Sequence, residues 1–477
     1  MPLYNKANMR KLKDKHFGLK KINPYVLVIL SFVIVIFVGS VLLMMPFSQA
    51  SGKWGNYMDA LFQAVSATCV TGLCTYANGI GNELTFFGQL IMLLMIQIGG
   101  LGFVTVLTFF ITLFKTKLEF KDRYLISQMV GSTSFADVIK FVRKIIIISL
   151  TAETIGALIG LPVFFEMFPE NKLLAVWNSI FTSVSAFNNA GFDLLGGMSF
   201  VRDPANTLVY NLPTWAYYYL LTYVMVLIVA GGISFLVIID VFSFKKFSQY
   251  RVFSKIALIT TAFLILSGFG LFLITETLFN HAGVFNALFQ SVTLRTAGFA
   301  SYSQDKLSLV GKVFSCILML IGGSPLSTAG GIKTTTAFMI FLAMFCYFRG
   351  KQVVAFKRTY SANMIVKAMS LVFLAIAIIL TGIVSLSGFE YYSSISDLGI
   401  ETSKEMSIIY EVFSAFGTVG VSIGITPYLT IGSKIVICFL MFLGRLGPIT
   451  FLQIFQANMD KKQSLHYEYV EEDFLIG

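Results

Sequence analysis

Charged side chains are scarce in this sequence. Only 12% of its 477 residues are Asp, Glu, Lys or Arg, whereas 56% are hydrophobic, and the mean hydropathy is +0.80. Soluble domains carry about 25% charged residues, so this composition excludes a soluble globular protein and indicates an integral membrane protein. Lys and Arg outnumber Asp and Glu by 35 to 24. Because this excess falls in loops between apolar stretches, it reports membrane orientation and gives no support for nucleic-acid binding.

Histidine and paired cysteine are also nearly absent. The three histidines, at positions 16, 281 and 466, lie in flanks or loops, so the apolar segments contain no His-based catalytic centre. The five cysteines form no CxxC pair, which argues against a metal site or a disulfide framework and favours free apolar thiols. A stretch ending in GGIKT resembles a phosphate-binding loop, but Ile332 separates its Gly from Lys333. A membrane enzyme is therefore the weakest interpretation.

What the chain does contain is one motif repeated four times. A short apolar half-helix with a Ser or Thr inside it runs into a Gly, and the copies read FQAVSATCVTGL from Phe62, FTSVSAFNNAGF from Phe181, FQSVTLRTAGF from Phe289 and YEVFSAFGTVGV from Tyr410. Each copy lies between two long apolar spans. A half-helix of about a dozen residues cannot cross roughly 30 Å of hydrocarbon, so each is predicted to enter the membrane and return.

This pattern predicts an all-α integral membrane protein with four tandem helix, re-entrant pore loop, helix units around one pore. The expected boundaries are an N-terminal arm over 1–23, pore units over 24–115, 116–243, 244–350 and 351–458, and a C-terminal tail over 459–477. Lys and Arg cluster in the segments before, between and after the units. These segments and both termini are therefore predicted to be cytoplasmic, and the pore loops to enter from outside.

The four Gly-containing loops are predicted to form a cation filter. A half-helix points the negative end of its dipole at a cation near the membrane centre, and the Gly after it can adopt a positive φ that turns carbonyl oxygens towards one axis. Each loop has one Gly where potassium channels have two, so weaker ion discrimination is expected. The candidate ion-binding residues, which would hold a cation through backbone carbonyls, are Val70, Thr71, Gly72, Asn189, Ala190, Gly191, Thr296, Ala297, Gly298, Thr418, Val419 and Gly420.

The second span of each unit carries a further repeated motif, which reads GGLGF, GGISF, GGSPL and GRLGP in the four units. In the first two units, close helix packing is the simplest explanation of the paired Gly. The third copy continues as GGSPLSTAGG over residues 322–331, which is too rich in Gly and Pro for a continuous helix. We therefore predict a gate in the membrane. Its candidate residues are Gly322, Gly323, Ser324, Pro325, Ser327, Thr328, Gly330, Gly331, Lys333 and Arg445.

Four charged residues in or beside apolar segments leave alternatives open. Arg445 replaces the second Gly of the motif, where a charge either lines the pore or belongs to a structural ion pair. Lys333 lies near the gate or places its charge at the membrane interface. Arg295 is expected to hydrogen-bond loop carbonyls and so hold the third filter. Glu153 either pairs with loop backbone groups or belongs to a helix interface.

These features together resemble the Trk/Ktr/HKT superfamily of potassium transporters. The resemblance rests on four units with single-Gly filters, on GGSPLSTAGGIKTTT and on the Arg of GRLGP, and the short N-terminal arm is most similar to KtrB, the membrane subunit of bacterial Ktr systems. It implies K+ uptake across the plasma membrane, often dependent on Na+, by a homodimer with one pore per protomer, and it places Arg445 in the pore. It also implies docking on a cytosolic ring of regulatory KtrA subunits, which would hold the nucleotide, with no cofactor in this chain.

A secondary transporter for another monovalent cation, Na+ or ammonium, is the stronger rival interpretation, since broken helices also build substrate sites. Such sites usually carry intramembrane acids or inverted repeats, whereas these repeats run parallel and offer backbone oxygen. Membrane potential supplies about 2.3 kcal/mol per charge per 100 mV, so uptake needs no nucleotide hydrolysis in this chain. The sequence therefore favours a lipid-embedded permeation path for K+.

Overall fold

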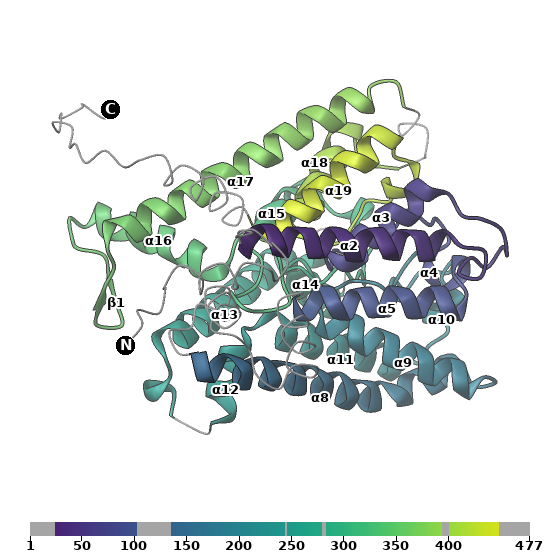
Figure 1. The fold of residues 1–477 in the computed structure, drawn as a ribbon, viewed down its shortest axis with the longest axis horizontal. Helices are drawn as coiled ribbons and strands as arrows, with labels where there is room; N and C mark the ends of the chain where they lie inside the picture. The colour runs from purple at the N-terminus through teal and green to yellow at the C-terminus, as the bar shows by residue number, and fades with distance from the viewer. Residues whose placement is uncertain (1–23, 103–134, 244–245, 279–282, 394–399, 448–477) are drawn as a thin grey trace, which may run out of the picture.

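The computed structural model describes residues 24–102, 135–243, 246–278, 283–393 and 400–447. The predicted N-terminal arm and C-terminal tail, over 1–23 and 459–477, lie outside these residues. Within the described ranges the chain is almost entirely helical (Figure 1), and it forms four sequential repeats, each with a first long helix, a short re-entrant helix and a second helix. The prediction of an all-α protein built from four such units is confirmed.

The elements of the four repeats have the following bounds. The first helices are α2 (Pro24–Met44), α8 (Phe135–Met167), α13 (Val252–Phe272) and α17 (Ala362–Phe389). The re-entrant helices are α3 (Tyr57–Thr68), α9 (Lys172–Phe187), α14 (Val284–Thr293) and α18 (Lys404–Gly417). The second helices are α5 (Phe86–Leu101), α11 (Thr214–Gly232) followed by α12 (Phe235–Phe242), α15 (Leu309–Leu320) followed by α16 (Thr334–Phe348), and α19 (Ile431–Leu446). Shorter elements are α4 (Ile80–Glu83), α10 (Thr207–Tyr210), the 3-10 turns η1 (Phe247–Gln249), η3 (Gln304–Lys306) and η5 (Thr426–Tyr428), the π-helical turn η2 (Leu273–Leu278), and the strands β1 (Val354–Ala355) and β2 (Arg358–Thr359).

The long helices carry an apolar exterior. In the described part of the chain, four helices are long and apolar enough to cross a membrane: Val142–Met167, Thr214–Gly232, Val252–Thr277 and Ala362–Phe389. Large apolar side chains on their outer faces are exposed, for example Phe263 at 67% and Phe373 at 77%. A soluble protein rarely exposes such contiguous apolar surface, so this surface is the one that faces lipid.

The core surrounds the re-entrant helices. The repeated aromatic of the sequence motif is fully buried in every copy, with 0% exposure at Phe62, Phe181, Phe289 and Tyr410. Each of these rings belongs to one of three apolar clusters that join neighbouring repeats. The motif therefore lies at the centre of the fold, because its buried aromatic side chain anchors each re-entrant helix in an apolar cluster.

Each second helix is interrupted at its glycine-pair motif. The breaks come after Leu101 at Gly102 (φ 77°), after Gly232, after Leu320, and after Leu446 at Gly447 (φ 77°). The expectation that the first two pairs serve helix packing is met, since a Cβ on Gly99 or Gly231 would overlap the last carbonyl of the re-entrant helix, at Thr68 or Phe187. The sequence did not reveal that the helix also ends there.

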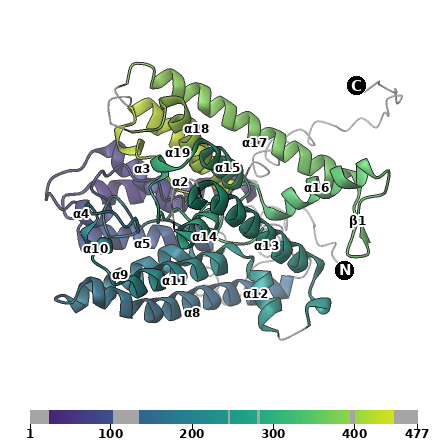
Figure 2. The same ribbon diagram turned by 180° about the vertical axis from the view of Figure 1, so that it is seen from behind.

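The repeats follow one another around a closed ring. A side-chain hydrogen bond crosses each interface between neighbouring repeats, here called a seam. Trp177 Nε1 donates to Gln89 Oε1 at 2.7 Å between repeats 1 and 2, and Tyr217 Oη donates to Asn286 Oδ1 at 3.2 Å between repeats 2 and 3. Tyr410 Oη donates to Gln304 Oε1 at 2.6 Å between repeats 3 and 4, and Lys434 Nζ donates to Asp59 Oδ1 at 2.7 Å between repeats 4 and 1. Figures 1 and 2 show α2, α5, α8 and α11 side by side on one part of this ring.

Repeats 3 and 4 are joined by two further structures, at opposite ends of the molecule. At one end, Asp305 accepts hydrogen bonds from the N–H groups of Glu401 and Thr402 at 3.0 and 2.9 Å. Burial alone would raise the pKa of Asp305, but the hydrogen bonds from Thr402 and Glu401 lower it below its ordinary value. At the other end, the hairpin of β1 and β2 extends beyond the helices together with α16 (Figure 1).

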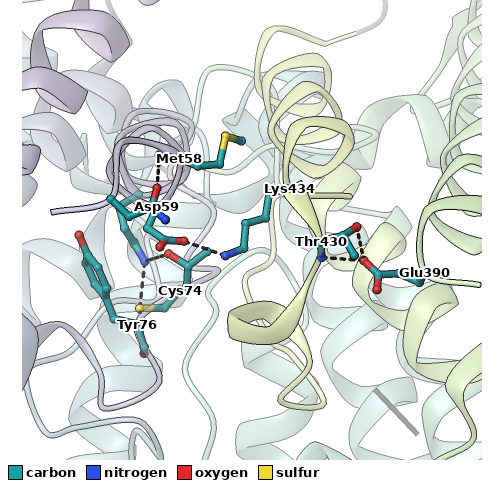
Figure 3. A network of polar contacts seen from close by, with 10 residues as sticks. Met58, Asp59, Cys74, Tyr76, Glu390, Thr430 and Lys434 are labelled. Carbon is teal, nitrogen blue, oxygen red and sulfur yellow. Dashed lines mark hydrogen bonds and ion pairs between the residues drawn. The ribbon is translucent and has the colours of Figure 1, made fainter. Parts of the chain in front are cut away.

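The seam between repeats 4 and 1 is the one that no direct chain connection closes. Figure 3 shows Lys434 on α19 reaching Asp59 on α3, beside the contact of Thr430 with Glu390. The side chains of Lys434 and Asp59 are only 11% and 23% exposed. A charge pair in such a setting is costly to break, because the remaining charge is left without its partner.

We expect the Asp59 and Lys434 side chains to be energetically coupled. In equilibrium unfolding in mixed SDS–detergent micelles, Asp59→Ala and Lys434→Ala should each destabilise the protein, and the double variant should show a coupling energy of about 1–3 kcal/mol. The exposed pair Asp203 and Lys306, 3.9 Å apart with 33% and 56% exposure, provides the matched control and should show at most about 1 kcal/mol. Equal coupling at the two pairs would refute a ring-closing role for Lys434.

Candidate functional site

The re-entrant helices direct their C-terminal ends towards one another. Three of them begin at a residue whose side chain accepts a backbone N–H: Asn56 from Met58 at 2.8 Å, Asn171 from Leu174 at 3.1 Å, and Ser403 from Met406 at 3.4 Å. Such caps satisfy the first turn of the helix. At the other end each helix runs into one of the loops 70–72, 189–191, 296–298 and 418–420, here named the glycine loops. The negative ends of the four helix dipoles therefore point at these loops.

Each glycine loop contains two left-handed residues separated by one residue. Their φ values are 56° and 105° at Val70 and Gly72, 58° and 70° at Asn189 and Gly191, 70° and 86° at Thr296 and Gly298, and 50° and 93° at Thr418 and Gly420. This alternation aligns successive peptide groups, so the carbonyl oxygens of a loop lie on one side. The positive φ at Gly was expected from the sequence, whereas the one two residues earlier was not, since β-branched residues rarely adopt it.

The four loop glycines meet around a single axis. A Cβ on Gly72 would lie 2.6 Å from Ala190 O, one on Gly191 2.7 Å from Ala297 O, and one on Gly298 2.7 Å from Val419 O, while one on Gly420 would overlap Thr71 O. The order 72, 191, 298, 420 and back to 72 matches the order of the repeats around the ring. The structure thus brings together the twelve residues that the sequence singled out, and only Gly fits at the closest point.

The repeated hydroxyl residue of the motif braces its own loop. Ser66 Oγ accepts from Gly72 N at 3.2 Å, Ser185 Oγ from Phe192 N at 3.0 Å, and Ser414 Oγ from Gly420 N at 3.1 Å. In the shorter third copy, Thr293 Oγ1 instead donates to Phe299 O at 2.6 Å. All four hydroxyl residues are 0% exposed. The sequence noted this residue by its spacing, and the contacts give its function, which is to fix the backbone after the left-handed turn.

A cavity of about 430 Å³ lies on one side of the glycine ring. The four loop glycines form its floor, and the segments that follow the loops form its walls, with acidic side chains at Asp193 and Asp203 and hydroxyl groups at Ser422 and Thr426 among the lining. Oxygen-rich walls with acidic groups suit a hydrated cation, since they offer partners to its water shell. The cavity leads directly to the loop carbonyls.

The segment 322–331 lies on the other side of the ring. It connects α15 to α16 without helical structure, and hydrogen bonds attach it to repeat 2. Ser324 N donates to Gly232 O at 3.1 Å. Thr328 Oγ1 donates to Gly231 O at 3.0 Å and to Phe187 O at 3.3 Å. Within the segment, Ser327 Oγ donates to Ser324 O at 2.6 Å. Non-helical backbone at membrane depth is stable only where protein supplies such partners.

Arg445 joins three repeats below the ring. Its guanidinium donates to Thr328 O in repeat 3 and to Gly99 O in repeat 1, and also to Gly100 O at 3.3 Å. Repeats 3 and 1 are the two neighbours of repeat 4 in the ring, so this one side chain links both of them. Of the two alternatives from the sequence, a structural ion pair finds no support, because no carboxylate of the described residues lies within 4.0 Å of Arg445.

The remaining charged candidates also have defined partners. Lys333 Nζ donates to Ala329 O at 2.6 Å, so it caps the 322–331 segment and does not extend to an interface. Arg295 donates to Thr261 Oγ1 on α13 at 3.4 Å. The described hydrogen bonds include none from Arg295 to a loop carbonyl, which contradicts that expectation. Arg295 therefore attaches the third loop to its first helix.

Glu153 lies at a junction next to the second glycine loop. Its carboxylate accepts hydrogen bonds from Ser149 Oγ at 2.8 Å, Gln97 Nε2 at 3.0 Å and Asn188 Nδ2 at 2.9 Å. These donors belong to α8, to α5 and to the residue before Asn189. Of the two alternatives from the sequence, the helix interface is supported, because donors on α5 and α8 both contact the carboxylate. The hydrogen bonds of the described residues include none from a loop backbone group to it.

Comparison with known proteins identifies the family. Residues 5–467 match the TrkH family of cation transport proteins. The chain belongs to this family. It is 38% identical to the potassium/sodium uptake protein NtpJ of Enterococcus hirae, over 96% of this chain and 98% of that protein. It is 34% identical to the Ktr system potassium uptake protein B of Bacillus subtilis, over 95% and 97%.

Solved structures show the same fold. The crystal structure of the potassium transporter TrkH from Vibrio parahaemolyticus matches with a TM-score of 0.68 at 17% identity, covering 94% of this chain and 88% of that one. The resemblance to the Trk/Ktr/HKT superfamily is thereby confirmed, and so is the prediction of an ion transporter and not a membrane enzyme.

The glycine ring predicts a specific substitution effect. Gly420→Ser places a side chain against Thr71 O and strains a left-handed residue, so it should displace ring carbonyls and lower discrimination between monovalent cations by about tenfold, which corresponds to about 1.4 kcal/mol. Competitive uptake of Rb+ and Na+ into proteoliposomes measures this. Gly424→Ser is the matched control, since Gly424 has a φ of 105° but nothing within 4 Å of its added Cβ. Equal discrimination in both variants would remove the ring from the ion path.

Proposed function

We propose that this protein takes up K+ across the plasma membrane through the four glycine loops, acting as its selectivity filter. The observation that carries the proposal is the ring of four left-handed glycines, each at the C-terminal end of a re-entrant helix. Aligned carbonyls and converging dipoles replace the water of a monovalent cation without any acidic ligand. The relatives named as potassium uptake proteins support K+ as the ion.

Na+ is the second candidate ion. One relative of 38% identity is named a potassium/sodium uptake protein, and a single Gly in each loop offers fewer carbonyl rings than a potassium channel has. We propose that Na+ supports K+ uptake and competes with it at the filter. The driving force is the membrane potential, together with the ion gradients.

The proposed assembly is a homodimer bound to a cytosolic ring of nucleotide-binding regulatory subunits. Relatives named as proteins B and D of Ktr systems support a multi-component system. The hairpin end of the protein offers exposed positive charge for docking, at Arg349, Lys351, Lys357 and Arg358. This end would face the cytoplasm together with both termini, in line with the positive-inside rule. Within each protomer, we propose that the four pore units keep the boundaries predicted from the sequence.

The proposed gate is the 322–331 segment held by Arg445. Arg445 places a positive charge on the axis, and its contacts with Thr328 and Gly99 close the path below the filter. A cation meets both a steric and an electrostatic barrier there. Opening requires the segment to leave its contacts with repeat 2, so the gate has two states that a partner can bias.

Ion flux tests the proposed function directly. Proteoliposomes that contain the purified chain and carry an imposed inside-negative potential should accumulate Rb+, external K+ should inhibit this uptake more strongly than Na+, and low Na+ should stimulate it. Empty liposomes and liposomes without a potential provide the controls. A protein of intact size that moves no monovalent cation under any potential would contradict the proposal, and stronger inhibition by Na+ than by K+ would favour Na+ as the substrate.

The gate generates its own prediction. Arg445→Ala removes the charge and the bridge, and deletion of Ser327–Gly330 removes the segment that closes the path, so each should raise Rb+ flux several-fold in liposomes that lack any regulatory partner. Arg251→Ala, at an arginine whose side chain is 63% exposed, is the control and should conduct like the parent. If neither gate variant conducts better than the parent at equal protein density, the segment is structural and the barrier lies elsewhere.

A further inference from the structure

One position of the repeat differs chemically between repeats. The residue directly after the buried aromatic is polar in every copy: Gln63, Thr182, Gln290 and Glu411. All four side chains are buried, with exposures of 0%, 0%, 2% and 0%. An acid in this position is found in repeat 4 alone. Buried carboxylates are costly, so this one calls for an explanation.

The position contacts the chain that leaves the glycine loop. Gln63 Nε2 donates to Cys74 Sγ at 3.1 Å and Thr75 Oγ1 at 3.4 Å, and Gln290 Nε2 donates to Gln304 Oε1 at 2.6 Å. Glu411 contacts the corresponding part of repeat 4. Its carboxylate accepts from Ser422 Oγ at 2.8 Å and from Thr426 Oγ1. In repeats 1, 3 and 4 this side chain therefore holds the wall above its loop; Thr182 of repeat 2 makes no such hydrogen bond with any described residue.

Glu411 performs this task with a carboxyl group that has no cationic partner among the described residues. Ser422 and Thr426, which donate to it, line the cavity above the ring. In the described part of the chain, no Lys, Arg or His nitrogen lies within 4.0 Å of the Glu411 carboxylate. Asp203, another acid of the cavity, does have such a partner in Lys306. An acidic group thus lies directly behind two hydroxyl groups of the cavity wall.

We propose that Glu411 is an affinity-determining residue, whose carboxylate acts through space to raise the occupancy of the cavity and outermost filter site by monovalent cations. This inference rests on the proposed function. Glu411 touches no ion, since Ser422 and Thr426 stand between it and the cavity. A unit charge about 10 Å away at an effective dielectric constant near 20 changes cation affinity roughly tenfold. Among the four equivalent positions only the one in repeat 4 carries an acid, so this charge is a contribution of repeat 4 alone.

The experiment removes the charge and keeps the shape. Glu411→Gln gives repeat 4 the residue that repeats 1 and 3 already have. We expect the KM for Rb+ uptake to rise roughly tenfold while the maximal rate stays within about twofold, and the Rb+ concentration that raises the unfolding temperature should increase in parallel. Glu390→Gln is the matched control. Glu390 is equally buried and accepts from Thr430 Oγ1 at 2.8 Å, but Thr430 does not line the cavity, whereas both hydroxyl donors to Glu411 do, so the KM should not change.

Moving the charge separates electrostatics from geometry. In the double variant Glu411→Gln with Gln63→Glu, the carboxylate stands at the equivalent place in repeat 1, where Thr75 and Cys74 can donate to it. A through-space effect predicts that the KM returns to near the parental value, whereas a role confined to the wall of repeat 4 predicts no rescue. An unchanged KM in Glu411→Gln, or a raised KM without rescue in a double variant of normal size and maximal rate, would overturn the proposal.

A variant that fails to fold does not block the test. Gln63→Glu in the otherwise unchanged protein adds a second carboxylate and should lower the KM, again by roughly tenfold; an unchanged KM overturns the proposal. Failure of the proposed function has a different signature. In that case the parent protein itself shows neither Rb+ uptake nor Rb+-dependent stabilisation.

Discussion

The approach of four backbones to one axis is the constraint on which the rest of this structure depends. Each loop glycine lies where an added Cβ would press on a carbonyl of the neighbouring loop, and each follows a non-glycine residue in the left-handed region. Holding a non-glycine residue in the left-handed region costs about 1–3 kcal/mol of folding free energy. This conformation persists only where the surrounding structure fixes it. Here the surroundings are the buried aromatic, the bracing hydroxyl and the end of the re-entrant helix, all of which the repeated motif supplies within eleven or twelve residues.

The same constraint explains why the second helices break. The first Gly of a pair lets the second helix touch the end of the re-entrant helix, as Gly99 does at Thr68 O and Gly444 at Phe416 O. In repeats 1 and 4 the second helix ends two residues after this contact, and the next residue is a Gly with positive φ, Gly102 or Gly447. The close approach at the glycine loops and the end of the second helix therefore belong to one packing arrangement.

The sequence predicted what repeats and missed contacts between residues that lie far apart along the chain. Four copies of one spacing were enough to identify the re-entrant helices, the loop glycines and the ring, because periodicity and length leave few alternatives in a membrane. Partners that lie far apart along the chain left no such pattern. Thus Arg295 was assigned to loop carbonyls, although it contacts Thr261, and Glu153 could not be matched with Gln97 and Asn188. The left-handed conformation of Val70 and Thr418 was also missed, because β-branched residues rarely adopt it.

The proposed gate depends on a departure from fourfold symmetry. The second place of the glycine pair holds Gly100, Gly232 and Gly323 in three repeats and Arg445 in the fourth. Only a long side chain there can reach Thr328 in one neighbour and Gly99 in the other. Lys333 fixes the same segment to the start of α16, which continues to the hairpin end of the molecule. A displacement of α16 by a partner at that end would therefore act on the Arg445 bridge before it disturbed the filter, whose loops are held by their own hydroxyl groups.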